Sequence, residues 1–64
     1  MTNKQFSAAL TRMGVTQQGF AETIKVNDRT VRNWVSGRSE VPTAIAMLIR
    51  LMLDTGTRPE DLRA

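Results

Sequence analysis

Helix start and stop signals alternate at short intervals along this 64-residue chain, and they leave room for little except packed short helices. Thr2, Thr16 and Asn27 are residue types that cap a helix N-terminus, because their side-chain oxygens accept hydrogen bonds from first-turn N–H groups. Gly14 and Gly37 are of the type that ends a helix. The helices that these signals predict cover residues 3–13, 17–25 and 28–36.

The second half of the chain continues the pattern. Pro42 suits the first position of a helix, which we expect to run to about Thr55. Thr57 and Glu60 have the spacing of a capping box, so a short fifth helix is expected over 58–63. No segment alternates with the period of two that marks a strand. The sequence therefore predicts a single all-α domain of five helices.

The chain contains neither cysteine nor histidine, which removes several classes of function. Disulfides and zinc sites of the Cys/His kind are excluded. A catalytic pair built on Cys or His is absent, and the six acidic residues show no clustering that suggests shared catalysis. We therefore expect no enzyme activity, no metal and no cofactor.

The N-terminus and the apolar segments bear on the location of the protein. Met1 to Gln5 lead into no apolar stretch of the kind found in a signal peptide. The longest apolar stretch, residues 44–53, is interrupted by Arg50 and is far shorter than the roughly 20 residues of a membrane span. We expect a soluble cytoplasmic protein that does not contact a membrane.

Positive charge is concentrated in the middle of the chain. The formal net charge is +3, and residues 25–38 alone hold four basic residues and one acidic residue. A local basic patch is typical of proteins that bind polyanions. The alternative is that these charges only keep one face of the protein solvated.

The helix predicted over 28–36 divides into two faces at about 100° per residue. Valine and tryptophan side chains lie on one face, which must be buried. Polar residues occupy an arc of roughly 140° on the other. The members of this polar arc are Asp28, Arg29, Arg32, Asn33 and Ser36.

The side chains of the polar arc suit the edges of DNA bases. An arginine fork can donate two hydrogen bonds to guanine O6 and N7, and asparagine can pair with adenine in the same bidentate way. Aspartate can accept from cytosine N4, or it can hold a neighbouring arginine in position. An ordinary solvated face of an amphipathic helix is the alternative interpretation.

Residues 17–37 resemble the helix-turn-helix of the phage Cro and C1 repressor family, also called the xenobiotic-response-element family. Ala21 matches the small residue that lets the two helices cross closely, while Gly37 and Pro42 match the exit from the second helix. The resemblance implies a lambda-repressor-like domain with its helix-turn-helix at helices two and three. The apolar side chains expected to form the core of this motif are Phe20, Ala21, Ile24, Val26, Val31 and Trp34.

The same resemblance implies roles in DNA binding. It places Asp28, Arg29, Arg32 and Asn33 on base edges and Gln17 on the phosphate backbone. Helix N-termini present free N–H groups to anions, which makes the role of Gln17 physically reasonable. Further candidates for phosphate contacts are Thr16, Lys25, Thr30 and Arg38, the last of which is alternatively a solubilising charge.

The sequence departs from the family pattern inside the motif. Lys25 stands in the turn where the family usually has glycine, and Gly19 replaces a better helix former. A non-glycine residue in the left-handed conformation costs about 1–2 kcal/mol. We therefore expect the turn to be either reshaped or mildly strained.

The fourth helix carries more apolar surface than a single buried face needs. Beside the inward stripe runs a second one that includes Met47 and Leu51, and Leu62 of the fifth helix adds to it. Either this helix is buried on most sides, or the second stripe forms a self-complementary dimer surface. We favour a homodimer, whose two reading helices would lie about 34 Å apart and require an inverted-repeat site.

These observations together predict a sequence-specific regulator of transcription, in the first place a repressor that binds double-stranded DNA in or near its own promoter. Control by protein concentration is expected, since 64 residues leave no second domain for a small-molecule ligand. The protein would act in the cytoplasm of a bacterial or phage-infected cell, in association with DNA. Small regulators of this kind occur in phages and other mobile elements, including those beside anti-CRISPR genes, and the sequence does not select that context over a chromosomal one.

Two other functions compete with this one. An antitoxin-like module would bind DNA with the same fold and a partner protein with a tail, but only two residues follow Leu62. RNA binding through the same basic face is the other alternative, although that face lacks an aromatic platform on which bases can stack.

Overall fold

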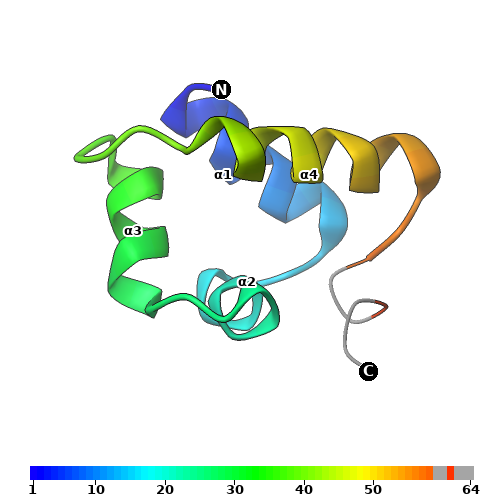
Figure 1. The fold of residues 1–64 in the computed structure, drawn as a ribbon, viewed down its shortest axis with the longest axis horizontal. Helices are drawn as coiled ribbons and strands as arrows, with labels where there is room; N and C mark the ends of the chain where they lie inside the picture. The colour runs from blue at the N-terminus through cyan, green and yellow to red at the C-terminus, as the bar shows by residue number, and fades with distance from the viewer. Residues whose placement is uncertain (59–60, 62–64) are drawn as a thin grey trace.

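The computed structural model of the protein describes residues 1–58 and 61, and these residues form four helices and no strand (Figure 1). Helix α3 stands at one end of the molecule, α2 is viewed along its axis beside it, and α1 lies behind α4 (Figure 1). Helix α2 packs on α3, while α1 packs on both α3 and α4. The helices are α1 (Asn3–Met13), α2 (Gln17–Ile24), α3 (Asp28–Ser36) and α4 (Thr43–Thr55).

The N-terminal caps predicted from the sequence are confirmed. The Gln5 N–H donates to Thr2 Oγ1 at 3.1 Å, and the Thr2 N–H donates to Gln5 Oε1 at 2.9 Å, which completes a capping box. Thr16 Oγ1 accepts from the Gly19 N–H at 2.9 Å. The start of α3 is capped in the same way by the side chain of Asn27. Local hydrogen bonds thus fix where three of the four helices begin.

Two helix boundaries differ from the sequence prediction by one residue. Helix α4 begins at Thr43, because Pro42 has an extended backbone with ψ of 145° and occupies the N-cap position. Helix α2 ends at Ile24, because Lys25 has already left the helical conformation.

The expectation of five helices is not met by the described residues, which form four. The segment expected to be helical, 58–63, lies largely outside the described residues. Within it, the Arg58 N–H donates to Asp61 Oδ2 at 3.0 Å and the Asp61 N–H donates to the Arg58 carbonyl at 2.9 Å. The side chain of Asp61 thus accepts the Arg58 N–H, while Glu60, a member of the predicted capping box, lies outside the described residues.

Phe6 stands at the centre of the core and joins three helices. Its ring is fully buried, and it makes edge-to-face contacts with Phe20 of α2 and Trp34 of α3, each with a centroid separation of 5.7 Å. Edge-to-face pairs of this kind add about 0.5–1.5 kcal/mol each beyond the burial of their area. One aromatic side chain of α1 therefore sets how α2 and α3 lie relative to each other.

The apolar residues predicted to form the core of α2 and α3 all either belong to the hydrophobic core or pack against it. Phe20, Ala21, Val31 and Trp34 are buried, as predicted. Ile24 and Val26 are only half-buried, since they lie at the turn where the core meets solvent. The remaining buried residues, contributed by α1, α4 and the segment between α3 and α4, are Ala9, Leu10, Met13, Val41, Ile49 and Met52.

The turn between α2 and α3 is strained at Lys25. This residue has a φ of 62° and a ψ of 40°, which is the left-handed conformation, and no other described non-glycine residue has a positive φ. The Val26 N–H then donates to the Ala21 carbonyl at 3.0 Å, so the chain turns tightly into α3. Of the two outcomes expected from the sequence, the structure shows the strained turn.

Replacing Lys25 with glycine is expected to stabilise the fold by about 0.5–1 kcal/mol. Relief of the left-handed strain exceeds the entropy that glycine adds to the unfolded chain. Thermal denaturation followed by circular dichroism should show a rise in Tm of several degrees. The control is Lys25→Ala, which removes the charge but keeps the strain and should bring no such gain; an equal gain from both variants would contradict this account.

Candidate nucleic-acid interface

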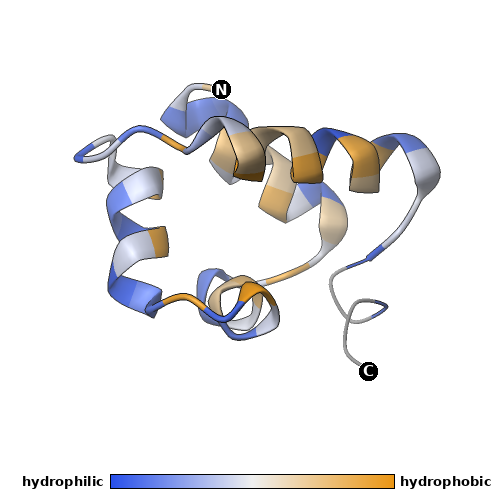
Figure 2. Ribbon diagram, viewed as in Figure 1, coloured by the Kyte–Doolittle hydropathy of each residue, from blue (hydrophilic) through white to orange (hydrophobic). Residues whose placement is uncertain are grey.

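Helix α3 presents a polar face to solvent and an apolar face to the core. Val31 and Trp34 are buried, whereas Asp28, Arg29 and Arg32 are exposed. In Figure 2 most of α3 is hydrophilic, whereas α4 is apolar along much of its length. The division into two faces that the sequence predicted is therefore present in the folded chain.

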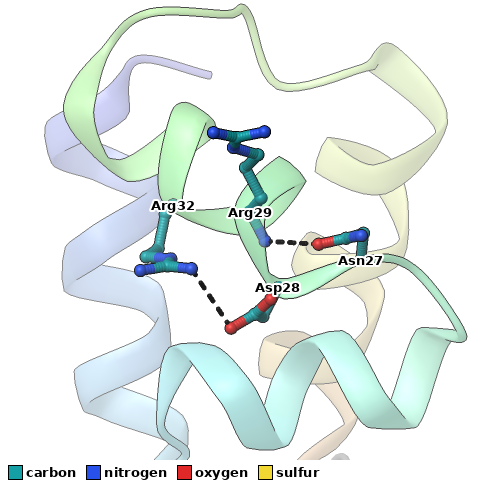
Figure 3. A network of polar contacts seen from close by, with 4 residues as sticks. All are labelled: Asn27, Asp28, Arg29 and Arg32. Carbon is teal, nitrogen blue, oxygen red and sulfur yellow. Dashed lines mark hydrogen bonds and ion pairs between the residues drawn. The ribbon is translucent and has the colours of Figure 1, made fainter.

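Asp28 and Arg32 pair across one turn of α3. Arg32 Nη2 lies 3.4 Å from Asp28 Oδ2, and both side chains stay exposed to solvent. Figure 3 shows these two side chains pointing toward each other, while the Arg29 side chain points away from them. The exposed face of α3 therefore offers one arginine held beside a carboxylate and a second arginine that extends outward.

The exposed pair borders an open cleft of about 510 Å³ between α1, α2 and α3. The cleft brings together two groups that the sequence assigned to different roles. Asp28 and Arg32 come from the proposed base-reading set, and Thr16 and Gln17 come from the proposed phosphate-binding set. The residues that line it are Ser7, Leu10, Thr11, Val15, Thr16, Gln17, Gln18, Asp28 and Arg32.

The N-terminus of α2 borders this cleft. Thr16 Oγ1 already accepts the Gly19 N–H, and the Phe20 N–H bonds to the Thr16 carbonyl. Gln17 and Gln18 stand in the first turn, where no earlier helical carbonyl is available to their N–H groups. Because such a helix end carries a partial positive charge, the cleft offers a favourable place for an anion.

Five of the nine predicted DNA-contacting residues do not line the cleft, and the outward-pointing Arg29 is one of them. Lys25 is exposed at the turn between α2 and α3, and Arg38 is exposed in the loop after α3, where its N–H donates to Ser36 Oγ at 3.4 Å. Asn33 and Thr30 are half-buried on α3 and present less of their surface than the two arginines. The structure thus does not gather all nine predicted contacts at one place.

Sequence reasoning missed three polar residues that line the same cleft. Gln18 follows the predicted Gln17, and Ser7 and Thr11 lie one turn apart on α1, where Thr11 Oγ1 donates to the Ser7 carbonyl at 3.2 Å. The helical spacing of Ser7 and Thr11 could have shown that they share a face. That this face borders the start of α2 follows only from the packing of the folded chain.

A side chain of α1 also fixes the far end of α3. Asn3 Nδ2 donates to the Val35 carbonyl at 3.3 Å, across 32 positions of sequence. Val35 belongs to the last turn of α3, whose carbonyls have no partner within the helix. The polar face of α3 is therefore held at both ends, by the Asn27 cap at its start and by Asn3 near its end.

The exposed side of α4 carries two large apolar side chains. Met47 is 66% exposed and Leu51 is 60% exposed, although both lie within a helix whose opposite side is buried. Of the alternatives left open by the sequence, α4 is therefore not buried on most sides. Leu62, the third residue predicted for a dimer surface, lies outside the described residues.

The described part of the chain holds no group of three or more acidic, histidine or cysteine residues placed to bind a metal ion. None of its four helices combines the length and the apolar run required to cross a bilayer. Comparisons with protein-family models, with curated proteins and with solved structures find no match for this chain.

Proposed function

We propose that the protein is a sequence-specific DNA-binding regulator of transcription, with α2 and α3 acting as a helix-turn-helix of the Cro and C1 repressor type. In this proposal α3 enters the major groove, which is about 12 Å wide and admits an α-helix. Arg29 and Arg32 then reach base edges, and the start of α2 meets the phosphate backbone. Occupation of a promoter by the protein would block transcription from it.

One observation carries the proposal. A single cleft is lined both by Asp28 and Arg32 on the exposed face of α3 and by Thr16 and Gln17 at the start of α2. A protein that reads DNA needs both kinds of group close together, because phosphate contacts fix the register while base contacts supply the sequence preference. Lys25 and Arg38, exposed at the two ends of α3, extend the basic surface along the backbone.

The arrangement of the protein on DNA is tested by hydroxyl-radical footprinting of the region upstream of its own gene. A two-fold dimer should protect two patches about one helical turn apart, related as an inverted repeat. A uniform pattern without protected patches would contradict the proposal.

Self-association through α4 belongs to the same proposal. Met47 and Leu51 lie one turn apart on the exposed side of this helix, and their burial by a second copy would remove apolar surface from water. A pair of reading helices would also double the number of base contacts, which a single nine-residue helix supplies only sparsely.

Replacing both Met47 and Leu51 with lysine is expected to produce a folded monomer. Both side chains are mostly exposed, so the fold should persist, whereas two charges on each copy would repel at the proposed interface. Sedimentation equilibrium measures the mass, and affinity for a two-half-site DNA should fall about tenfold or more. The matched control places lysines at Ala8 and Ser39, two exposed positions that do not line the cleft. If both double variants had the same mass as the unmodified protein, α4 would not be the interface.

A further inference from the structure

The Asp28–Arg32 pair has a geometry that leaves most of its hydrogen-bonding capacity available. The contact joins one guanidinium nitrogen, Nη2, to one carboxylate oxygen, Oδ2, at 3.4 Å. The Arg32 side chain is 64% exposed and that of Asp28 is 51% exposed. A guanidinium has five N–H donors and a carboxylate has about four acceptor positions, so a single-point contact uses only a small part of each.

The pair therefore presents a donor fork directly beside an acceptor. Both groups stand on the exposed face of α3 and are aligned by their spacing of one helical turn (Figure 3). The contact with Arg32 uses Oδ2 of Asp28, which leaves the second oxygen, Oδ1, for another donor. Arg29 points away from this pair and is not part of it (Figure 3).

The base edges in the major groove complement this arrangement in a specific way. Guanine offers two acceptors, O6 and N7, to an arginine fork. Only cytosine N4 and adenine N6 offer donors, and adenine places its N7 acceptor next to that donor. A carboxylate is repelled by an acceptor, so cytosine, which presents only a donor, is the base that fits Asp28.

We propose that Asp28 and Arg32 act as one reading unit that recognises a guanine with a cytosine next to it, Asp28 being the specificity determinant. The inference rests on the proposed DNA-binding function and assigns this part of its site to one base step. Asp28 is a negative charge facing a polyanion, and so it lowers the affinity for DNA in general. Asp28 instead contributes sequence preference. Its carboxylate favours a cytosine at the base position that it faces and disfavours bases that present an acceptor there.

The test is selection of bound sequences from a random duplex library, followed by affinity measurements on the selected sites. The unmodified protein should enrich guanine beside cytosine. Asp28→Ala should keep the guanine and reduce the preference for cytosine by about tenfold or more. Asp28→Asn should shift that position toward adenine, because asparagine pairs with adenine N6 and N7.

The matched control is Glu40→Gln, which removes the same charge from the exposed loop after α3. It should leave the selected sequence unchanged, and thermal denaturation should show that all variants are folded at the temperature of the selection. An unchanged sequence for Asp28→Ala would overturn the inference. Loss of guanine and cytosine together would also overturn it, because Asp28 would then only hold Arg32. If the unmodified protein enriched no sequence, the proposed function itself would fail, a result distinct from the other two.

Discussion

Replacing Arg29 and Arg32 together with alanine is expected to lower the affinity for the preferred DNA site by about a hundredfold or more. Each bidentate contact between arginine and guanine contributes about 1–3 kcal/mol of discrimination, and both side chains are exposed on α3. Their removal should leave the fold intact, because neither side chain contributes to the core. Fluorescence anisotropy with a labelled duplex at fixed salt measures the effect.

The control for this prediction is the double variant with alanine at Arg12 and Arg50. Both residues are exposed, but they lie in α1 and α4 rather than on the face of α3. This variant loses the same total charge, so it should weaken binding to all sequences equally and only modestly. If the two double variants lost the same affinity, bulk attraction would explain the binding and base contacts by α3 would be contradicted.

Replacing Phe6 with alanine is expected to remove a large share of the stability of the fold. The ring is fully buried and contacts both Phe20 and Trp34, and large-to-small changes of this kind cost about 3–5 kcal/mol. A chain of this length has a total stability of roughly 3–10 kcal/mol. Urea denaturation followed by the fluorescence of Trp34, the one tryptophan in the sequence, reports the loss.

Ser7→Ala is the control for this second prediction. Ser7 is exposed on the same helix, and a surface change of this kind should alter the free energy of unfolding by no more than about 0.5 kcal/mol. If Phe6→Ala lowered the free energy of unfolding by less than about 1 kcal/mol, which is the cost of removing a single methyl group from a core, the central position of this ring would be contradicted.

The helices of this fold could be predicted from the sequence because the signals that place them are local. The Thr2 capping box, the Thr16 cap and the Asn27 cap each involve residues no more than three positions apart. The sequence of α3 likewise defines its own two faces, so the exposure of Arg29 and Arg32 follows from helical spacing.

Features that depend on distant parts of the chain were not predictable in the same way. The cleft that joins Ser7 of α1 to Arg32 of α3 arises only when the helices pack. The bond from Asn3 to the Val35 carbonyl joins residues far apart in sequence and carries no local signal. Half-burial of Asn33 is also a consequence of packing, since helical spacing alone placed it with the exposed residues.

Gly19 shows how packing can explain an unfavourable local choice. Glycine within a helix is less stable than alanine by about 0.5–1 kcal/mol. In the folded chain, a Cβ at this position would lie 3.1 Å from Thr16 Oγ1 and 3.3 Å from Val15 Cγ2. The absence of a side chain at Gly19 therefore leaves space for Thr16, whose side chain caps the start of α2. This end of α2 borders the cleft.

The central claim, that α3 reads DNA sequence, is tested most directly by affinity for the gene's own upstream DNA and for a shuffled DNA of equal length and composition. Both should be measured from about 50 to 200 mM salt, because the phosphate contribution weakens steeply over that range. We expect both affinities to fall with salt while the upstream DNA stays at least about a thousandfold preferred. Equal affinity for the two DNAs at every salt concentration would contradict the claim.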